Sequence, residues 1–235
     1  MTNEKKLDLI QKYEDLSDEE FKESYFEKLK RFASDKDDTV KVFTASVLSR
    51  FADTAKQQEA IDILLQLCHE RNALVRTEAY DAIGCYFDQD VITNLENAIL
   101  SEKNGLARSY AIDSWIYIQQ HLCPDRVGVI AYLDGILEKE KDDYCILNCL
   151  YGKYSFGERN ILDNILSYTK NEDYHIRCSV LSVISLILED KNCAEQCRAK
   201  IITVVTELLW KEKTKAVREC AEELIKRLEH FSRTL

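Results

Sequence analysis

The sequence predicts an all-α fold, a solenoid of about six stacked helix pairs. Two observations lead to this prediction. The 235 residues include only one proline and six glycines, well below the usual shares of about 5% and 7%, and so few helix breakers favour helices over strands and turns. In addition, one pattern of capping, apolar and small residues recurs at steps of 31 to 41 residues, which is close to the length of helix-pair repeats.

The repeated pattern is best seen from a reference column, which reads Lys41, Arg76, Arg108, Ile146, Arg177 and Arg218. The residues one step before and three steps after the reference are apolar or small, and two further core positions follow at six and seven steps. This spacing places them on one stripe of a helix. Four steps before the reference stand good N-cap residues, namely Asp37, Asn72, Asn104, Asp142, Asp173 and Thr214. A helix is therefore predicted to begin after each of them.

Each of these helices follows a segment with helical apolar spacing of its own, such as "QQEAIDILLQLCHE" or "AEQCRAKIITVVTELLW". The unit is therefore a helix pair. We expect a single domain over residues 1–235 with an N-terminal capping helix at about 1–16. The expected repeats are about 17–52, 53–88, 89–122, 123–157, 158–190 and 191–235. The fourth repeat departs from the pattern, because Ile146 replaces the arginine and Lys153 stands at an apolar position.

The order Asp or Asn, Val-Arg, Ala, then a small and an aliphatic residue resembles the second helix of HEAT repeats over about residues 17–231. The strongest copy is "NALVRTEAYDAIG", from Asn72 to Gly84. The resemblance implies a right-handed α–α superhelix, in which small residues such as Ala79 and Ala111 let neighbouring helices approach closely. It also implies that the arginines of the reference column pair with the capping acids of adjacent repeats.

Charge indicates which kinds of partner the protein can bind, and the cysteine content indicates the redox state of its compartment. The chain has a net charge of −10, and residues 39–190 carry 14 basic and 23 acidic side chains. Such a segment repels phosphate backbones and attracts basic protein surfaces, so nucleic acid is an unfavourable ligand. No apolar run approaches the roughly 18 residues of a membrane span, and nine cysteines without an apolar leader indicate reduced thiols. We expect a cytoplasmic monomer that does not enter membranes.

Signatures of catalysis or metal binding are sparse. The sequence contains no Gly-rich phosphate loop, no G-x-S-x-G elbow and no H-E-x-x-H pair. Cys145 with Cys149, and Cys193 with Cys197, have a spacing that could supply half of a zinc site. The first pair falls in the apolar columns, where a thiol behaves as a small hydrophobe. We therefore expect no catalytic residue, cofactor or metal, and keep zinc at the second pair as the alternative.

Surface residues of the second helices are the candidate binding site. The resemblance implies that second helices line a concave face, and we expect positions one, four, five and eight after the reference to point outward. These positions and their neighbours give the candidate partner-binding residues Tyr80, Asp81, Asp113, Tyr117, Tyr151 and Tyr154. A groove of tyrosines and carboxylates suits a protein with basic side chains. We expect Tyr151 and Tyr154 to contribute to binding more than to stability.

The predicted function is non-enzymatic protein–protein interaction, with an immunity or inhibitor protein of a basic toxin or nuclease as one form of it. The alternative comes from the same resemblance, since HEAT-like proteins include alkylpurine DNA glycosylases and phycobilin lyases. Asp113, Trp115 and Tyr117 bear a superficial likeness to a glycosylase site. The middle groove positions contain no lysine or arginine to hold phosphates, and no feature requires a tetrapyrrole, so both enzymes rank below the interaction protein.

Overall fold

A computed structural model of the protein describes residues 1–122, 125–190, 193 and 195–233. These residues form thirteen α-helices and no strand, which confirms the all-α solenoid prediction. The chain divides into two compact units, Met1–Pro124 and Asp125–Leu235. The single domain with six repeat boundaries stays a prediction.

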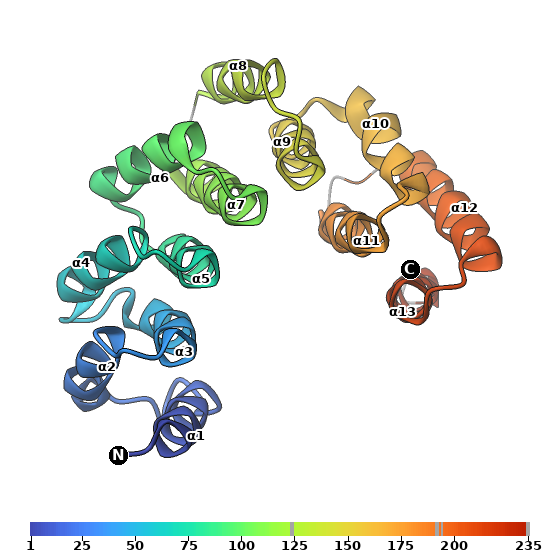
Figure 1. The fold of residues 1–235 in the computed structure, drawn as a ribbon. Coiled ribbons are helices and arrows are strands. Elements are labelled where there is room, and N and C mark those ends of the chain that lie inside the picture. The colour runs from blue at the N-terminus through green and yellow to red at the C-terminus, as the bar shows by residue number, and fades with distance from the viewer. Residues whose placement is uncertain (123–124, 191–192, 194, 234–235) are drawn as a thin grey trace. The chain divides into compact units, whose positions relative to one another are not determined.

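Unit 1 is built from two layers of helices. Its α-helices are α1 (Asn3–Glu14), α2 (Phe26–Ala33), α3 (Asp38–Leu48), α4 (Gln57–Leu67), α5 (Ala73–Ile83), α6 (Gln89–Ser101) and α7 (Gly105–Leu122). Short 3-10 turns lie at Glu23–Tyr25 and Ser49–Phe51. In Figure 1, α1, α3, α5 and α7 form one layer and α2, α4 and α6 form the other, and each member contacts the next within its layer.

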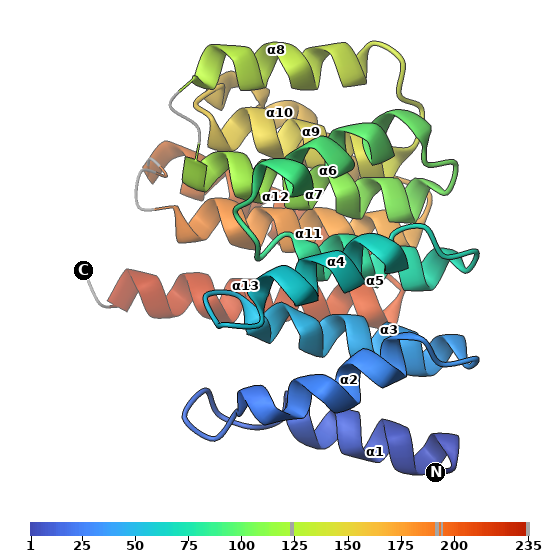
Figure 2. The same cartoon turned by 90° about the vertical axis from the view of Figure 1, so that its left-hand side faces the viewer.

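Unit 2 repeats this arrangement. Its α-helices are α8 (Arg126–Leu137), α9 (Asp143–Ser155), α10 (Leu162–Ser167), α11 (Tyr174–Glu189), α12 (Glu195–Lys211) and α13 (Lys215–Arg233). Two 3-10 turns, Arg159–Ile161 and Tyr168–Lys170, flank the short α10. Helices α9, α11 and α13 form one layer, and α10 packs against α12 in the other (Figure 1). Figure 2 shows α11 and α13 along their length, one beside the other.

The capping column sets where the second helices begin. Helices α3, α5, α7, α9, α11 and α13 each start one residue after the predicted N-cap. Asp37 and Asn72, for example, accept hydrogen bonds of 2.9 Å from the amides of Thr39 and Leu74. These side chains satisfy backbone N–H groups that have no partner inside the helix. The prediction of six helix starts is confirmed by the structure.

Small residues let α5 and α7 pack closely. Ala79 and Ala111 are fully buried, as the pattern predicted. A Cβ atom added to Gly84 would lie 2.6 Å from Ser114 Oγ, so only glycine fits there without a shift of the neighbouring helix. Ser114 Oγ donates a 2.7 Å hydrogen bond to the carbonyl of Tyr80. Backbone and side chain of the two helices are therefore in direct contact.

The cations of the reference column bind different acids from those expected. Arg76 makes two hydrogen bonds to Glu102, of 2.6 and 2.9 Å, and Arg177 does the same to Glu212 at 2.7 and 3.1 Å. The expectation that the capping acids are the main partners is wrong. The acids stand six residues before the next reference position, in a column of Asp35, Glu70, Glu102, Glu140 and Glu212, where Asn171 takes the place of an acid in one repeat.

Each of these ion pairs therefore joins the second helix of one helix pair to the loop inside the next helix pair. Lys41 binds Glu70 in the same way at 2.9 Å. The hydrogen bond from Arg177 lowers the pKa of Glu212 to about 2, which means that the charged form is held in the folded protein. The side chains of Glu102 and Glu212 are only 5% and 6% exposed, so these contacts are more buried than ordinary surface ion pairs.

The irregular fourth repeat also has a structural explanation. Lys153, which interrupts the apolar stripe of α9, is buried with its ammonium 2.5 Å from Asp134 on α8 and 3.0 Å from Glu158. A buried charge is tolerated when it is paired in this way. Lys153 thus joins the two helices of its pair, in the place where other repeats use an apolar contact.

Candidate functional site

The second-helix layer of unit 1 carries a stripe of acidic and aromatic side chains. On α7, Tyr110, Asp113, Tyr117 and His121 follow one another at steps of 3, 4 and 4 residues, which places them on one side of the helix. We call the surface formed by this stripe and by the adjacent residues of α5 and of the loop after it the α5–α7 face. The adjacent residues are Glu78, Asp81, Cys85 and Phe87.

Carboxylates occupy the centre of the α5–α7 face. Burial, together with the negative charge of Asp81, raises the pKa of Asp113 to about 6. Burial also raises the pKa of Asp81, and burial followed by the charge of Asp81 raises that of Glu78. Within the described residues, none of these three carboxylates forms an ion pair with lysine or arginine. The face therefore presents negative charge that the protein does not neutralise itself.

Aromatic rings border the carboxylates. The ring of Phe87 stacks on Tyr117 and His121, with centroids 6.1 and 4.9 Å apart. Phe87 and Tyr117 are 44% and 47% exposed, which is high for large rings and offers apolar contact area to a partner. Tyr110, 36% exposed, lies beside the acids, because burial and then the charges of Asp81, Glu78 and Asp113 raise its pKa.

The structure brings together three of the six predicted site residues. Asp81, Asp113 and Tyr117 lie on the α5–α7 face. Tyr80 is buried, and its hydroxyl donates a 3.3 Å hydrogen bond to the carbonyl of Cys68. The expectation that Tyr80 points outward is therefore wrong.

The remaining two predicted residues belong to α9 in unit 2. Tyr154 is 1% exposed and Tyr151 is partly buried against the same apolar core. The expectation of an outward Tyr154 is wrong, and Tyr151 offers only part of its side chain. The physical reason is that α5 packs against α3, α4 and α7, and α9 packs against α8, α10 and α11. Of the nine positions after the reference on α5 and α7, only two, five and nine stay open.

The sequence interpretation missed Glu78, Phe87, Tyr110 and His121. Glu78 and Tyr110 occupy the second position after the reference, and Phe87 lies in the loop that follows α5. The 3, 4, 4 spacing of Tyr110, Asp113, Tyr117 and His121 could have identified the open stripe of α7.

Asp113 makes the stability of the protein depend on pH. Its pKa of about 6 lies above the value of about 3.9 in an unfolded chain, so the folded state binds more protons between these values. The contribution of Asp113 to the free energy of unfolding therefore falls as pH rises from about 4 to about 6. We expect Asp113→Asn to stabilise the protein by about 1–2 kcal/mol at pH 7 and by much less at pH 4.5.

Urea unfolding of wild type and variant at both pH values measures this difference. Asp62→Asn, at an exposed position of α4, is the control and should show the same small effect at both. An equal effect of Asp113→Asn at pH 4.5 and 7 would contradict the raised pKa.

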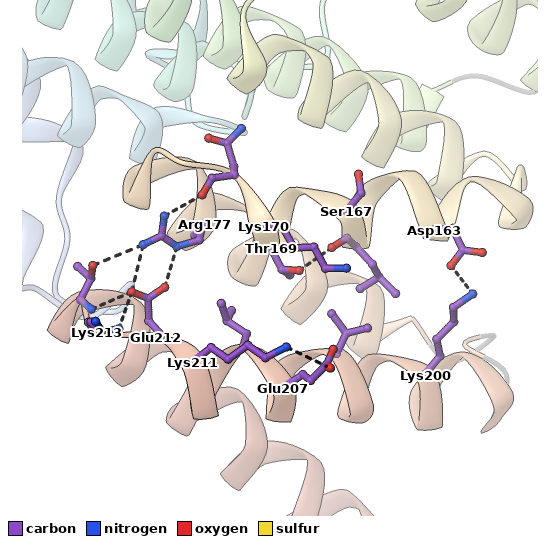
Figure 3. A pocket seen from close by; sticks show the side chains of 15 residues that line it. Asp163, Ser167, Thr169, Lys170, Arg177, Lys200, Glu207, Lys211, Glu212 and Lys213 are labelled. Carbon is purple, nitrogen blue, oxygen red and sulfur yellow. Dashed lines mark hydrogen bonds and ion pairs between the residues drawn. The ribbon is translucent and has the colours of Figure 1, made fainter.

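Unit 2 contains a second candidate, a pocket of about 720 Å³ between α10 and α12 (Figure 3). Leu166, Val204 and Leu208 supply its apolar part, and lysines stand around it. Two of the lysines are already paired, Lys200 with Asp163 and Lys211 with Glu207. Similar pockets lie between α2 and α4 and between α4 and α6. The pocket is therefore a crevice between successive first helices, a product of the repeat architecture.

Thiols and histidines do not gather into a metal centre in the residues that the structure covers, since no group of three or more His, Cys, Asp or Glu could hold an ion there. Cys145 and Cys149 are fully buried, as the apolar columns predicted. Cys193 is buried and Cys197 packs against the core of unit 2. Among the described helices, none is long and apolar enough to cross a bilayer.

Trp115 does not form part of an exposed aromatic wall. It is 3% exposed, and its indole N–H lies 3.2 Å from Glu96 Oε1 on α6. A glycosylase-like site needs rings that can stack on an extruded base. The likeness of Asp113, Trp115 and Tyr117 to such a site is therefore not supported by their placement.

Comparison with known families matches part of the chain. The family model described as HEAT repeats matches residues 26–115, from the start of α2 into α7. The matched segment includes Glu78, Asp81, Tyr110 and Asp113. Comparison with curated proteins finds no match.

Proposed function

Residues 26–115 match the HEAT-repeat family and the described residues form an all-α solenoid, and from this premise we propose that the protein binds a protein partner with a basic surface through the α5–α7 face. HEAT repeats are in general scaffolds for protein interaction. The observation that carries the proposal is the pair of unneutralised carboxylates, Asp81 and Asp113, between exposed rings.

The chemistry of the face favours a cationic partner. Burial is the main cause of the raised pKa of Asp113, and the negative charge of Asp81 is the second. A lysine or arginine placed between Asp81 and Asp113 offsets both, because it compensates the lost hydration of the carboxylate and relieves the repulsion. The ion pair formed by such a lysine or arginine has a more favourable free energy than one at an ordinary surface site, because the carboxylate is already partly removed from water. Phe87 and Tyr117 supply neighbouring apolar area, which is typical of the residues that dominate binding energy at interfaces.

A cost in stability supports the same proposal. An acid whose pKa is raised in the folded state destabilises the fold at neutral pH. Side chains that break local rules at a cost in stability tend to occur at functional sites. Asp113 is such a side chain, since an amide or apolar residue at this position would make the folded protein more stable at neutral pH.

An inhibitor or immunity protein is one form of this function. An acidic face that covers the basic active surface of a toxin or nuclease would block its substrate, and the chain's net charge of −10 would steer the two proteins together. The phosphate backbone of a nucleic acid is disfavoured by the same charge. We propose a non-enzymatic role for these reasons.

A peptide of about 15 residues rich in lysine and arginine is a suitable probe. We expect the double variant Asp81→Asn with Asp113→Asn to weaken binding at least about tenfold in calorimetric titration at low salt, because two charges leave the face. Glu19→Gln with Asp62→Asn makes the same charge change at exposed positions elsewhere in unit 1. It should alter affinity no more than about twofold. Equal losses in both double variants would mean that the peptide senses only net charge.

A further inference from the structure

Eight cysteines of the described chain are free thiols, and two of them lie on neighbouring helices of unit 2. Cys178 is on α11 and is partly buried, whereas Cys220 is on α13 and is exposed. Helices α11 and α13 pack directly against each other in the second-helix layer (Figure 1). Neither thiol takes part in the face proposed to bind protein, because that face belongs to unit 1.

The register between α11 and α13 places these thiols opposite each other. Arg227 of α13 lies 3.3 Å from Ser185 Oγ of α11, a contact between residues 42 positions apart. Cys178 and Cys220 are separated by the same 42 positions, and each stands seven residues before its counterpart in that contact. Seven residues make about two helical turns and return to the same side of a helix. The cysteines therefore face the same interhelix seam as Ser185 and Arg227.

Electrostatics agrees with this placement. Burial raises the pKa of the Cys178 thiol, and the next largest influence is the Cys220 thiol. Arg177 acts in the opposite direction. Two thiols that influence each other in this way lie close together. Ala221, next to Cys220, is fully buried and keeps α13 near its neighbours.

We propose that Cys178 and Cys220 are a thiol–disulfide site that fastens α13 to α11 when the protein meets a low-molecular-weight disulfide such as glutathione disulfide. The exposed Cys220 thiolate attacks one sulfur of the oxidant and releases one glutathione thiolate. The Cys178 thiolate then attacks the Cys220 sulfur and releases the second. The cysteine pair loses two protons and two electrons, and glutathione disulfide is reduced to two glutathione molecules.

The Cys178–Cys220 disulfide would hold α13 against the rest of unit 2. Within the described residues of unit 2, α12 and α13 pack against α10 and α11 on one side, so this pair has fewer packing contacts to hold it than an inner pair. A disulfide between α11 and α13 closes a loop of about 42 residues and restricts the unfolded chain, which stabilises the folded form. Because the rate depends on thiolates, bond formation should be faster at pH 8.5 than at pH 7.

Mass spectrometry of the intact full-length chain tests the proposal. After exposure to glutathione disulfide, we expect a loss of about 2 Da and a tryptic cross-link between the peptides of Cys178 and Cys220. The melting temperature should rise by at least about 5 °C and return after reduction. Cys178→Ser and Cys220→Ser should each abolish the cross-link, whereas Cys85→Ser, at an exposed cysteine of unit 1, should leave it intact.

Two results would overturn the proposal. One is a reaction that stops at a glutathione adduct on Cys220 in the folded wild-type protein. The other is a Cys178–Cys220 cross-link that forms only after the protein is unfolded in urea. The serine variants should keep the wild-type circular dichroism spectrum, so loss of the cross-link in them reports on the thiols and not on folding.

Discussion

Replacing Ala111 by aspartate should lower the free energy of unfolding by roughly 3–5 kcal/mol, enough to unfold a marginally stable protein. Ala111 is fully buried on α7, which packs against both α5 and α6. A carboxylate at this position loses water and meets helix surfaces that are shaped for a methyl group. It must either stay protonated or force the helices apart. Urea unfolding followed by circular dichroism measures the change in the full-length chain.

Ala79→Asp should behave in the same way, because Ala79 is the equivalent buried residue of α5. The matched control is Ala131→Asp, at an exposed position of α8, which should cost no more than about 0.5–1 kcal/mol. If Ala111→Asp melted within about 2 °C of wild type, the close packing of α5, α6 and α7 described above would be incorrect.

The helices and their starting points could be predicted because their causes are local. Asp37, Asn72 and Asp173 cap the helices that follow them through bonds to amides two residues away, and such bonds depend only on short segments of chain. The apolar stripe is also a local pattern, repeated six times. Repetition allows a weak copy, such as the one around Ile146, to be aligned by the stronger ones.

The direction of individual side chains was harder to predict, because it depends on which sides of a helix its neighbours cover. Tyr80 and Asp81 are adjacent in the sequence, yet Tyr80 reaches the carbonyl of Cys68 and Asp81 faces outward. A rotation of about 100° per residue separates them. Sequence spacing identified the second helix as the candidate site and position five after the reference as open, but it expected positions one, four and eight to be open where the structure exposes positions two and nine.

Long-range ion pairs were missed for a related reason. Arg76 and Glu102 are 26 residues apart, and nothing near Arg76 in the sequence indicates this partner. Only a comparison of all repeats shows an acid or amide six residues before each reference position. Lys153 is similar, since its partners Asp134 and Glu158 lie 19 and 5 residues away and stand outside the repeated pattern.

Tyr154→Ala should lower the free energy of unfolding by about 3–5 kcal/mol, which reverses the expectation from the sequence that Tyr154 contributes little to stability. The ring is 1% exposed within the apolar core of unit 2, beneath the Arg159 guanidinium at 4.4 Å from the ring centroid. Removal of the ring leaves a cavity, and the Arg159 guanidinium loses its aromatic partner. Tyr151→Ala, at a partly buried position of the same helix, should cost only about 1 kcal/mol.

Tyr154→Phe separates the ring from its hydroxyl. The hydroxyl is buried without a well-formed hydrogen bond in the described part of the structure, although the Arg159 guanidinium and the Cys193 thiol lie near it, so phenylalanine should cost no more than about 1 kcal/mol. Chemical unfolding of Tyr154→Ala, Tyr154→Phe and Tyr151→Ala gives the three values under one set of conditions. A large loss with phenylalanine would mean that the hydroxyl has a partner that stabilises the fold. A small loss with alanine would return Tyr154 to the surface, where it could contact a partner protein as the sequence first indicated.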